Sequence, residues 1–412
     1  MATAAISVVP RGVIVNRKPA VGIAGVIAAS VLVVAFAANS LGGSPTPSAP
    51  VGQVTAQPTG TPAPTGTPAP TASPLPTPSP TPLPTPLTVP APLTGRLVAP
   101  DVAARHPIAV MIDDLGPARP QSGLSSASVV WQAPAEGGIP RYMAIFQENL
   151  PAAIGPVRSS RYYYIAWAAE WRAVYAHSGG SPQALQTLRS KGSGQYVFNA
   201  DEFRYSGTFH RVFTRAAPHN LYTSGAKLRA LGKRLGATDK LASAIWHFAA
   251  DAPLDARPYG GTITVGYPDN LIRYTYDRTT NTYLRSVSGE KKETDAGTGT
   301  RIAPKNVIVM RMVFGPLNDG HPGAPRLEAN VVGSGTAWIS TNGRTIKGTW
   351  KKTGITKPTK FYDASGNEVT LTVGQTFVQV LTTSTSLYPA SFKAGSDQPP
   401  AMPTPSASSS GG

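Results

Sequence analysis

Three arginines stand within residues 137–164, a stretch otherwise rich in apolar, aromatic, glycine and proline residues: GGIPRYMAIFQENLPAAIGPVRSSRYYY. They are Arg141, Arg158 and Arg161. Guanidinium groups present forked N–H donors that match the oxygens of phosphate and carboxylate groups. Arg158 and Arg161 lie at the start of a predicted helix, where free N–H groups also favour an anion. The pattern predicts either a site for an external anion or internal ion pairs with acids of the chain.

Four further residues that could do chemistry follow predicted strands. Asp113 and Asp114 end the run HPIAVMIDD, Glu136 follows SVVWQA, and His177 ends AVYAH. In open α/β sheets ligands bind beyond the carboxyl ends of strands, so we expect these side chains to share one rim with the arginines. There they are the candidate catalytic residues, with the carboxylates supplying acid and base chemistry. The alternative is pairing between carboxylates and arginines, which we favour for Glu136.

The candidate ligand-binding set extends into nearby loops. Besides the three arginines it comprises Arg119, Ser178, His219 and Asn220. Ser178 beside His177 could form half of a nucleophilic pair, but the chain has no G-x-S-x-G elbow, and a turn with a helix cap explains residues 178–181 better. Asn220, in APHNLYTS, suits a turn.

Metal and cofactor sites are not indicated. The histidines lack H-E-x-x-H or a comparable metal-ligand spacing. The chain also lacks a Walker-type glycine loop, a dinucleotide fingerprint and an aromatic and basic RNA-binding motif. We therefore predict no metal, no cofactor and no nucleic-acid partner.

Strands and helices alternate in the first half of the chain. Apolar runs predict strands over 106–114, 128–133, 140–147 and 173–177. Helices are predicted after a cap at Ser159 or Ser160, after a cap at Ser181, and after Thr223 or Ser224. Short connections between such elements predict an α/β layered domain.

The second half has the alternating pattern of β-strands. GTITVGY, LIRYTYD and TYLRSV alternate, and TNGR between TAWIS and TIKGTW predicts a type I′ hairpin. The predicted fold class is therefore α+β overall: an N-terminal α/β layered domain over residues 96–255, followed by a mostly antiparallel β domain over residues 256–393.

The N-terminal residues predict the location of the protein. Residues 1–20 are basic, and residues 21–38 are 18 uncharged, mostly apolar residues. This length is the lower limit for a membrane span, and the basic side of a span stays in the cytoplasm. Cleavage at Ala35-Phe36-Ala37 is the alternative. We predict a single-pass cell-membrane protein with extracytoplasmic domains, or a secreted protein if the segment is a cleaved signal peptide.

Proline-rich sequence follows this segment. Residues 43–92 contain 17 prolines and no charged residue, which predicts a disordered, extended spacer over residues 39–95. Residues 394–412 predict a disordered tail of similar composition. The chain has no cysteine, which excludes disulfides and lipid attachment through an N-terminal cysteine.

The charge of the chain favours anionic partners. The 412 residues carry a formal charge of +16, and residues 96–393 hold 34 Lys and Arg against 20 Asp and Glu. Outside a cell membrane the available polyanions are lipid head groups, phosphorylated wall polymers and polysaccharides. A basic surface favours such a partner, although solubility alone would also explain it.

Several segments together resemble the YerB-like family of bacterial envelope proteins, the family with the domain of unknown function 3048. They include IAVMIDDLGPARPQSGL, EGGIPRYMAIFQ, IGPVRSSRYYYIAWAAEW, HSGGSPQAL and APHNLYTS in the first half, and RIAPKNVIVMRM and GRTIKGTWKK in the second. The resemblance covers residues 105–390 and implies an exported two-domain protein whose biochemical role is unassigned. Many members look like lipoproteins, whereas this chain lacks the required cysteine.

A shorter pattern suggests a second resemblance. The order strand, Arg, strand, P-x-R, helix and Gly-Gly turn is similar to that of the LytR-CpsA-Psr phosphotransferases, which hold a polyprenyl pyrophosphate. This resemblance implies phosphate contacts for Arg141, Arg158 and Arg161.

Three functions are consistent with these patterns. We favour a membrane-tethered binding or scaffold protein for an anionic envelope component, a wall polymer or lipid. The alternatives are an envelope phosphotransferase or hydrolase that acts on such a component, and an envelope factor that interacts only with proteins. The membrane is contacted through the N-terminal segment, and the oligomeric state is left open.

Overall fold

The computed structural model describes residues 87–240, 244–288, 292–320 and 325–400, all of which belong to one unit, Thr81–Gly412. The predicted basic segment, the predicted anchor or signal at 21–38, and most of the predicted spacer and tail lie outside these residues. Among the helices that the structure does describe, none has the length and apolar character needed to cross a bilayer.

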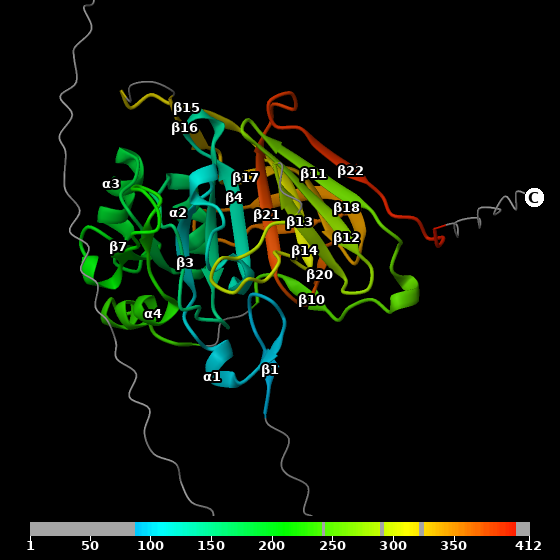
Figure 1. The fold of residues 1–412 in the computed structure, drawn as a ribbon, viewed down its shortest axis with the longest axis horizontal. Coiled ribbons are helices and arrows are strands. Elements are labelled where there is room, and N and C mark those ends of the chain that lie inside the picture. Colours follow the sequence, from blue (N-terminus) through cyan, green and yellow to red (C-terminus); the bar gives the residue numbers. More distant parts are fainter. Residues whose placement is uncertain (1–86, 241–243, 289–291, 321–324, 401–412) are drawn as a thin grey trace, which may run out of the picture. The chain divides into compact units, whose positions relative to one another are not determined.

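A ten-stranded mixed sheet forms the centre of this unit, in the order β19-β18-β17-β14-β21-β4-β5-β3-β6-β7 (Figure 1). Its strands in chain order are β3 (Ile108–Asp113), β4 (Val129–Pro134), β5 (Pro140–Phe146), β6 (Val174–His177), β7 (Phe198–Asp201), β14 (Asn306–Met312), β17 (Gly333–Thr341), β18 (Arg344–Lys352), β19 (Lys360–Tyr362) and β21 (Thr376–Thr382). Parallel pairing of β21 with β4 places Thr376 opposite Val129. The two halves of the chain therefore share one sheet.

A second sheet of four strands has the order β13-β12-β11-β22. Its strands are β11 (Thr262–Tyr267), β12 (Asn270–Asp277), β13 (Thr282–Val287) and β22 (Ala390–Lys393). The short strands pair as β1 (Val89–Pro90) with β2 (Leu97–Val98), β8 (His210–Arg211) with β9 (Leu221–Tyr222), β10 (His247–Ala249) with β20 (Thr370–Thr372), and β15 (Phe314–Leu317) with β16 (Arg326–Ala329). The predicted mixture of helices and strands is thus confirmed as a sheet-rich fold with one large mixed sheet.

The two faces of the large sheet have different covers. The helices are α1 (Pro100–Ala103), α2 (Tyr162–Ala168), α3 (Pro182–Lys191) and α4 (Gly225–Arg234). Because side chains alternate along a strand, Val110 and Ile112 of β3 enter a core with α4 and the four-stranded sheet. Ala109 and Met111 enter a second core with α2 and α3. Figure 1 shows α3, α4 and β7 together at one side, and β11, β12, β18 and β22 at the other.

Two predicted helix caps and the predicted hairpin turn are confirmed. Ser181 Oγ accepts a hydrogen bond from the Ala184 N–H before α3, and Ser224 caps α4 in the same way. Asn342 and Gly343 have φ of 48° and 75°, the left-handed conformations that a type I′ turn requires.

The predicted cap at Ser159 or Ser160 is wrong. Helix α2 begins at Tyr162, Arg161 occupies its N-cap position, and no side chain caps it. Ser160 is instead extended: its N–H donates to the Gly179 carbonyl, and its hydroxyl lies 2.8 Å from the Tyr175 hydroxyl. Backbone pairing with the loop after β6 therefore replaces the first turn of the predicted helix.

Candidate functional site

Strand directions bring most of the predicted polar residues to one edge of the large sheet. Strands β3 and β4 are both antiparallel to β5, and β6 and β7 run parallel to β3. The carboxyl ends of these four strands therefore lie on the same edge, next to the beginning of β5. Asp113 is directly opposite Arg141 in the ladder. We call the residues Asp113, Glu136, Arg141, Arg158 and Arg161 the arginine rim.

Glu136 is the centre of the arginine rim. Its Oε1 lies 2.5 Å from Arg161 Nη2, and its Oε2 lies 3.3 Å from Arg141 Nη2. The turn that carries Glu136 depends on glycine, because Gly138 has φ of 79° and a Cβ there would lie 2.5 Å from Pro268. One carboxylate therefore serves two guanidinium groups.

Burial and neighbouring charges together shift the pKa values of Glu136 and Arg141. Burial would raise the pKa of Glu136, but the hydrogen bond from Arg161 and the charges of Arg141 and Arg161 outweigh it and lower the pKa to about 2. Burial and the charge of Arg161 lower the pKa of Arg141 to about 10, against the attraction of Glu136. Because a carboxylate with such a low pKa is a weak base, its geometry supports the role of arginine partner.

Arg158 is held differently from the other two arginines. Its Nε lies 3.0 Å from Asp113 Oδ2, but without hydrogen-bond geometry. The same oxygen is 2.7 Å from His219 Nδ1. Within the described part of the chain, the Arg158 guanidinium donates no hydrogen bond, and its side chain is 23% exposed. The end of Arg158 thus has N–H donors that the described residues leave unused.

Asp114 and Arg119 lie apart from the rim. Asp114 is completely buried and, as the residue after Asp113, points to the opposite face of the sheet. Arg119 Nη2 contacts its Oδ1 at 2.9 Å, and Gln132 contacts its Oδ2 at 2.5 Å. Burial raises the pKa of Asp114 despite the charge of Arg119. This pair holds the loop after β3 to the interior.

The other predicted site residues hold loops together. His177 is completely buried, with ring nitrogens 2.8 Å from both the Gly179 carbonyl and Asn199 Oδ1. Ser178 donates to Glu202, and Asn220 accepts from Arg211. His177 and Ser178 therefore each bond elsewhere, and the arrangement lends no support to a nucleophilic pair.

One rim contact was missed by sequence reasoning. Arg326, in β16 of the second half, lies 3.8 Å from Glu136 through its Nε and 2.7 Å from Asp319 through its Nη1. Nothing in the local sequence around Arg326 links it to a turn 190 positions away. Only the tertiary fold brings it there.

Glu136→Gln is expected to make the protein less sensitive to acid. The lowered pKa of Glu136 means that its stabilising contribution is present above its ordinary value of 4.5 and is lost as the pH falls towards about 2. The variant lacks this contribution, so it should be less stable near pH 7 by about 2 kcal/mol and should lose less stability between pH 4.5 and 2. Urea unfolding over a pH series measures both effects.

The matched control for this measurement is Glu328→Gln, which changes an exposed carboxylate of β16. Its free energy of unfolding should change with pH as that of the unmodified protein does. If Glu136→Gln follows that dependence as well, Glu136 is not the ionised partner described above.

Comparison with known proteins identifies the two halves of the chain. Residues 93–238 match the family described as "Protein of unknown function (DUF3048) N-terminal domain". Residues 263–378 match the corresponding "Protein of unknown function (DUF3048) C-terminal domain". Both domains contribute strands to the ten-stranded sheet described above.

A relative and a solved structure agree with this match. The protein named "Putative lipoprotein YerB" of Bacillus subtilis (strain 168) is 32% identical over 264 residues, which cover 63% of this chain and 77% of that protein. The crystal structure of YerB protein from Bacillus subtilis is similar with a TM-score of 0.64 at 27% identity, over 73% of this chain and 99% of that one. This chain belongs to the DUF3048 family, the YerB-like proteins, and carries the N-terminal and C-terminal domains of that family in order.

Proposed function

We propose that this protein is an envelope-associated, extracytoplasmic binding protein that binds a phosphate-bearing envelope component at the arginine rim. Association with the envelope is supported by the similarity to a relative named as a lipoprotein. The predicted export segment at residues 21–38 supports the same location, although that segment lies outside the described residues.

The observation that carries this proposal is the unused donor capacity of Arg158. Three guanidinium groups on the rim face two carboxylates, those of Asp113 and Glu136. Burial is the main cause that lowers the pKa of Arg141, and the neighbouring charge of Arg161 adds to it, against the attraction of Glu136. A phosphate oxygen at the end of Arg158 would accept its N–H groups and offset this charge.

The rim supports binding better than turnover. Glu136 stays ionised because of its two arginines, and His177 and Asp114 are completely buried. Asp113 already contacts His219 and Arg158 through one oxygen. A general base needs a free oxygen or nitrogen within hydrogen-bond reach of the substrate. The described geometry of these four predicted catalytic residues thus favours structural and electrostatic roles.

Binding measurements with the full-length protein in non-ionic detergent test the proposal. Two ligands separate the sources of phosphate: a short glycerol phosphate oligomer for a wall polymer, and phosphatidylglycerol in mixed micelles for a lipid. Arg158→Gln should raise the Kd for one of these ligands about tenfold, the effect of losing a charge-assisted hydrogen bond. The Kd of Arg158→Lys should lie between those of the unmodified protein and Arg158→Gln, because lysine keeps the positive charge but lacks the forked N–H donors of arginine.

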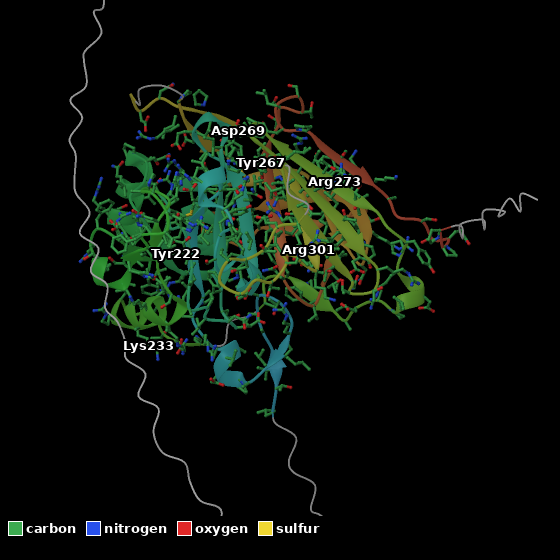
Figure 2. All side chains as sticks on the ribbon, viewed as in Figure 1. Tyr222, Lys233, Tyr267, Asp269, Arg273 and Arg301 are labelled. Atoms are coloured by element: carbon green, nitrogen blue, oxygen red, sulfur yellow. The ribbon has the colours of Figure 1, made fainter. Side chains whose placement is uncertain are left out.

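Arg273→Gln is the matched control, because Arg273 is an exposed arginine of β12 in the four-stranded sheet (Figure 2). It should bind both ligands as the unmodified protein does. Equal Kd values for the unmodified protein, Arg158→Gln and Arg273→Gln with both ligands would remove the rim as a binding site.

A further inference from the structure

Two phenylalanines are strongly exposed in the described part of the chain, and both lie in one segment. The side chains of Phe203 and Phe213 are 75% and 100% exposed. Single exposed apolar residues are common in soluble proteins, so exposure alone carries no function. These two, however, lie on two short segments that one ion pair joins. Arg211 Nη2 lies 3.6 Å from Glu202 Oε1, which joins the β8–β9 hairpin that carries Phe213 to the turn that carries Phe203.

Hydrogen bonds fix the backbone of the loops that carry both rings. Arg215 donates to the carbonyls of Pro117 and Pro120, at 3.3 and 2.7 Å, and so ties the loop after Phe213 to the loop after β3. Asp201 Oδ1 accepts the Phe203 N–H at 3.1 Å. The rings are therefore presented to solvent by fastened loops.

Arginines that form no ion pair among the described residues lie in this segment and in α4, although Asp201 and Glu202 directly precede Phe203. A surface cavity of about 400 Å³ is lined by Arg204, Tyr205, Ser206, Gly207, Thr208 and Arg234. Neither Arg204 nor Arg234 forms an ion pair with a carboxylate of the described residues, and Arg204 lies over the ring of Tyr205. Arg215 donates hydrogen bonds to two backbone carbonyl groups and forms no ion pair with a carboxylate of the described residues.

We infer that the segment 203–215, together with Arg234, is a membrane-docking surface for an anionic bilayer. Phe203 and Phe213 would enter the boundary between head groups and acyl chains, as aromatic side chains do at membrane interfaces. Arg204 and Arg234 would contact lipid phosphates, and the charge of Arg215 would attract the anionic surface. The inference goes beyond the proposed function, because it concerns other residues and a surface instead of a single ligand.

Charge and shape favour a bilayer over a protein partner. Protein interfaces have a contiguous apolar core, whereas here two separate rings are interspersed with arginines. Single aromatic rings between cationic side chains fit a lipid bilayer better, because lipid molecules can rearrange around each ring. In Figure 2, Tyr222 marks β9, which pairs with the strand that leads to Phe213.

The absence of cysteine allows a direct test, because one engineered cysteine gives one labelled position. The full-length protein is reconstituted into phosphatidylcholine vesicles with and without about 30% phosphatidylglycerol. An environment-sensitive dye on Thr214→Cys, an exposed position next to Phe213, should show a blue shift and quenching by lipid-bound quenchers in the anionic vesicles. The same dye on Thr349→Cys, exposed in β18, should stay in an aqueous environment.

Two variants in the Thr214→Cys background decide the interpretation. Phe203→Ser with Phe213→Ser should abolish the shift while leaving thermal unfolding unchanged, because both rings are exposed. Arg273→Gln, which changes an exposed arginine of β12, should leave the shift unchanged, which separates docking at this segment from a general effect of positive charge. If the dye at position 214 behaves like the dye at position 349 in both kinds of vesicle, or if the double serine variant keeps the full shift, the inference is overturned.

Discussion

Glu170→Ala is expected to lower the free energy of unfolding by about 3–5 kcal/mol, because it leaves a buried ammonium group without its partner. Glu170 Oε1 lies 2.8 Å from Lys352 Nζ, and both side chains are completely buried. Thr359 donates to the same oxygen at 2.6 Å. Burial raises the pKa of Glu170 and lowers the pKa of Lys352, so neither charge is stable there alone. Urea unfolding at neutral pH measures the loss.

Two control proteins separate this effect from a general loss of packing. Glu170→Leu combined with Lys352→Met removes both charges and should recover most of the lost stability, since apolar pairs often replace buried ion pairs at little cost. Lys351→Met changes the exposed neighbour on β18 and should stay within about 0.5 kcal/mol of the unmodified protein. A double variant as unstable as Glu170→Ala would show that the charge pair is not the cause.

The parts of the fold that the sequence predicts are the parts set by local chemistry. Continuous apolar runs predict β3, β4 and β6 because a strand buried on both faces has few polar positions. The caps at Ser181 and Ser224 follow from hydroxyl groups that accept the first free N–H groups of a helix. The failed cap at Ser160 has a tertiary cause, its pairing with residues 179 and 180.

Long-range pairing was beyond the reach of the sequence patterns. The parallel pairing of β4 with β21 joins strands that are 247 positions apart at Val129 and Thr376, and no local pattern specifies that register. The contact between Glu170 and Lys352 has the same origin, since each residue appears in the sequence only as a charge.

The candidate site was predicted in outline for a topological reason. Polar residues that follow strands of the same direction share an edge, which brought Asp113 and Glu136 together, and the beginning of the antiparallel strand β5 adds Arg141 there. The same rule cannot assign partners, because adjacent residues of a strand point to opposite faces. Asp113 therefore contacts Arg158 on the rim, whereas Asp114 contacts Arg119 in the interior. The sequence did not determine which arginine would keep free donors.

Arg285→Met is expected to lower the free energy of unfolding by about 3–5 kcal/mol, a large part of the total stability of most domains. Arg285 in β13 is completely buried between the two sheets, where it forms an ion pair with Glu293. Its other donors reach Gln132 Oε1 at 2.9 Å and the Tyr274 hydroxyl at 3.0 Å. Methionine fills similar space but leaves the buried Glu293 carboxylate with the Tyr142 hydroxyl, 3.4 Å away, as a remaining donor.

Arg273→Met on the neighbouring strand β12 is the matched control, since it makes the same chemical change at an exposed position. It should change the free energy of unfolding by less than about 0.5 kcal/mol. Arg285→Lys should be intermediate, because a single ammonium group keeps the charge but cannot reach three acceptors in different directions. Urea unfolding should rank Arg273→Met as the most stable of the three variants, Arg285→Lys as intermediate and Arg285→Met as the least stable. If Arg285→Met is as stable as Arg273→Met, Arg285 is dispensable to the contact between the sheets, and the hydrophobic core alone holds them together.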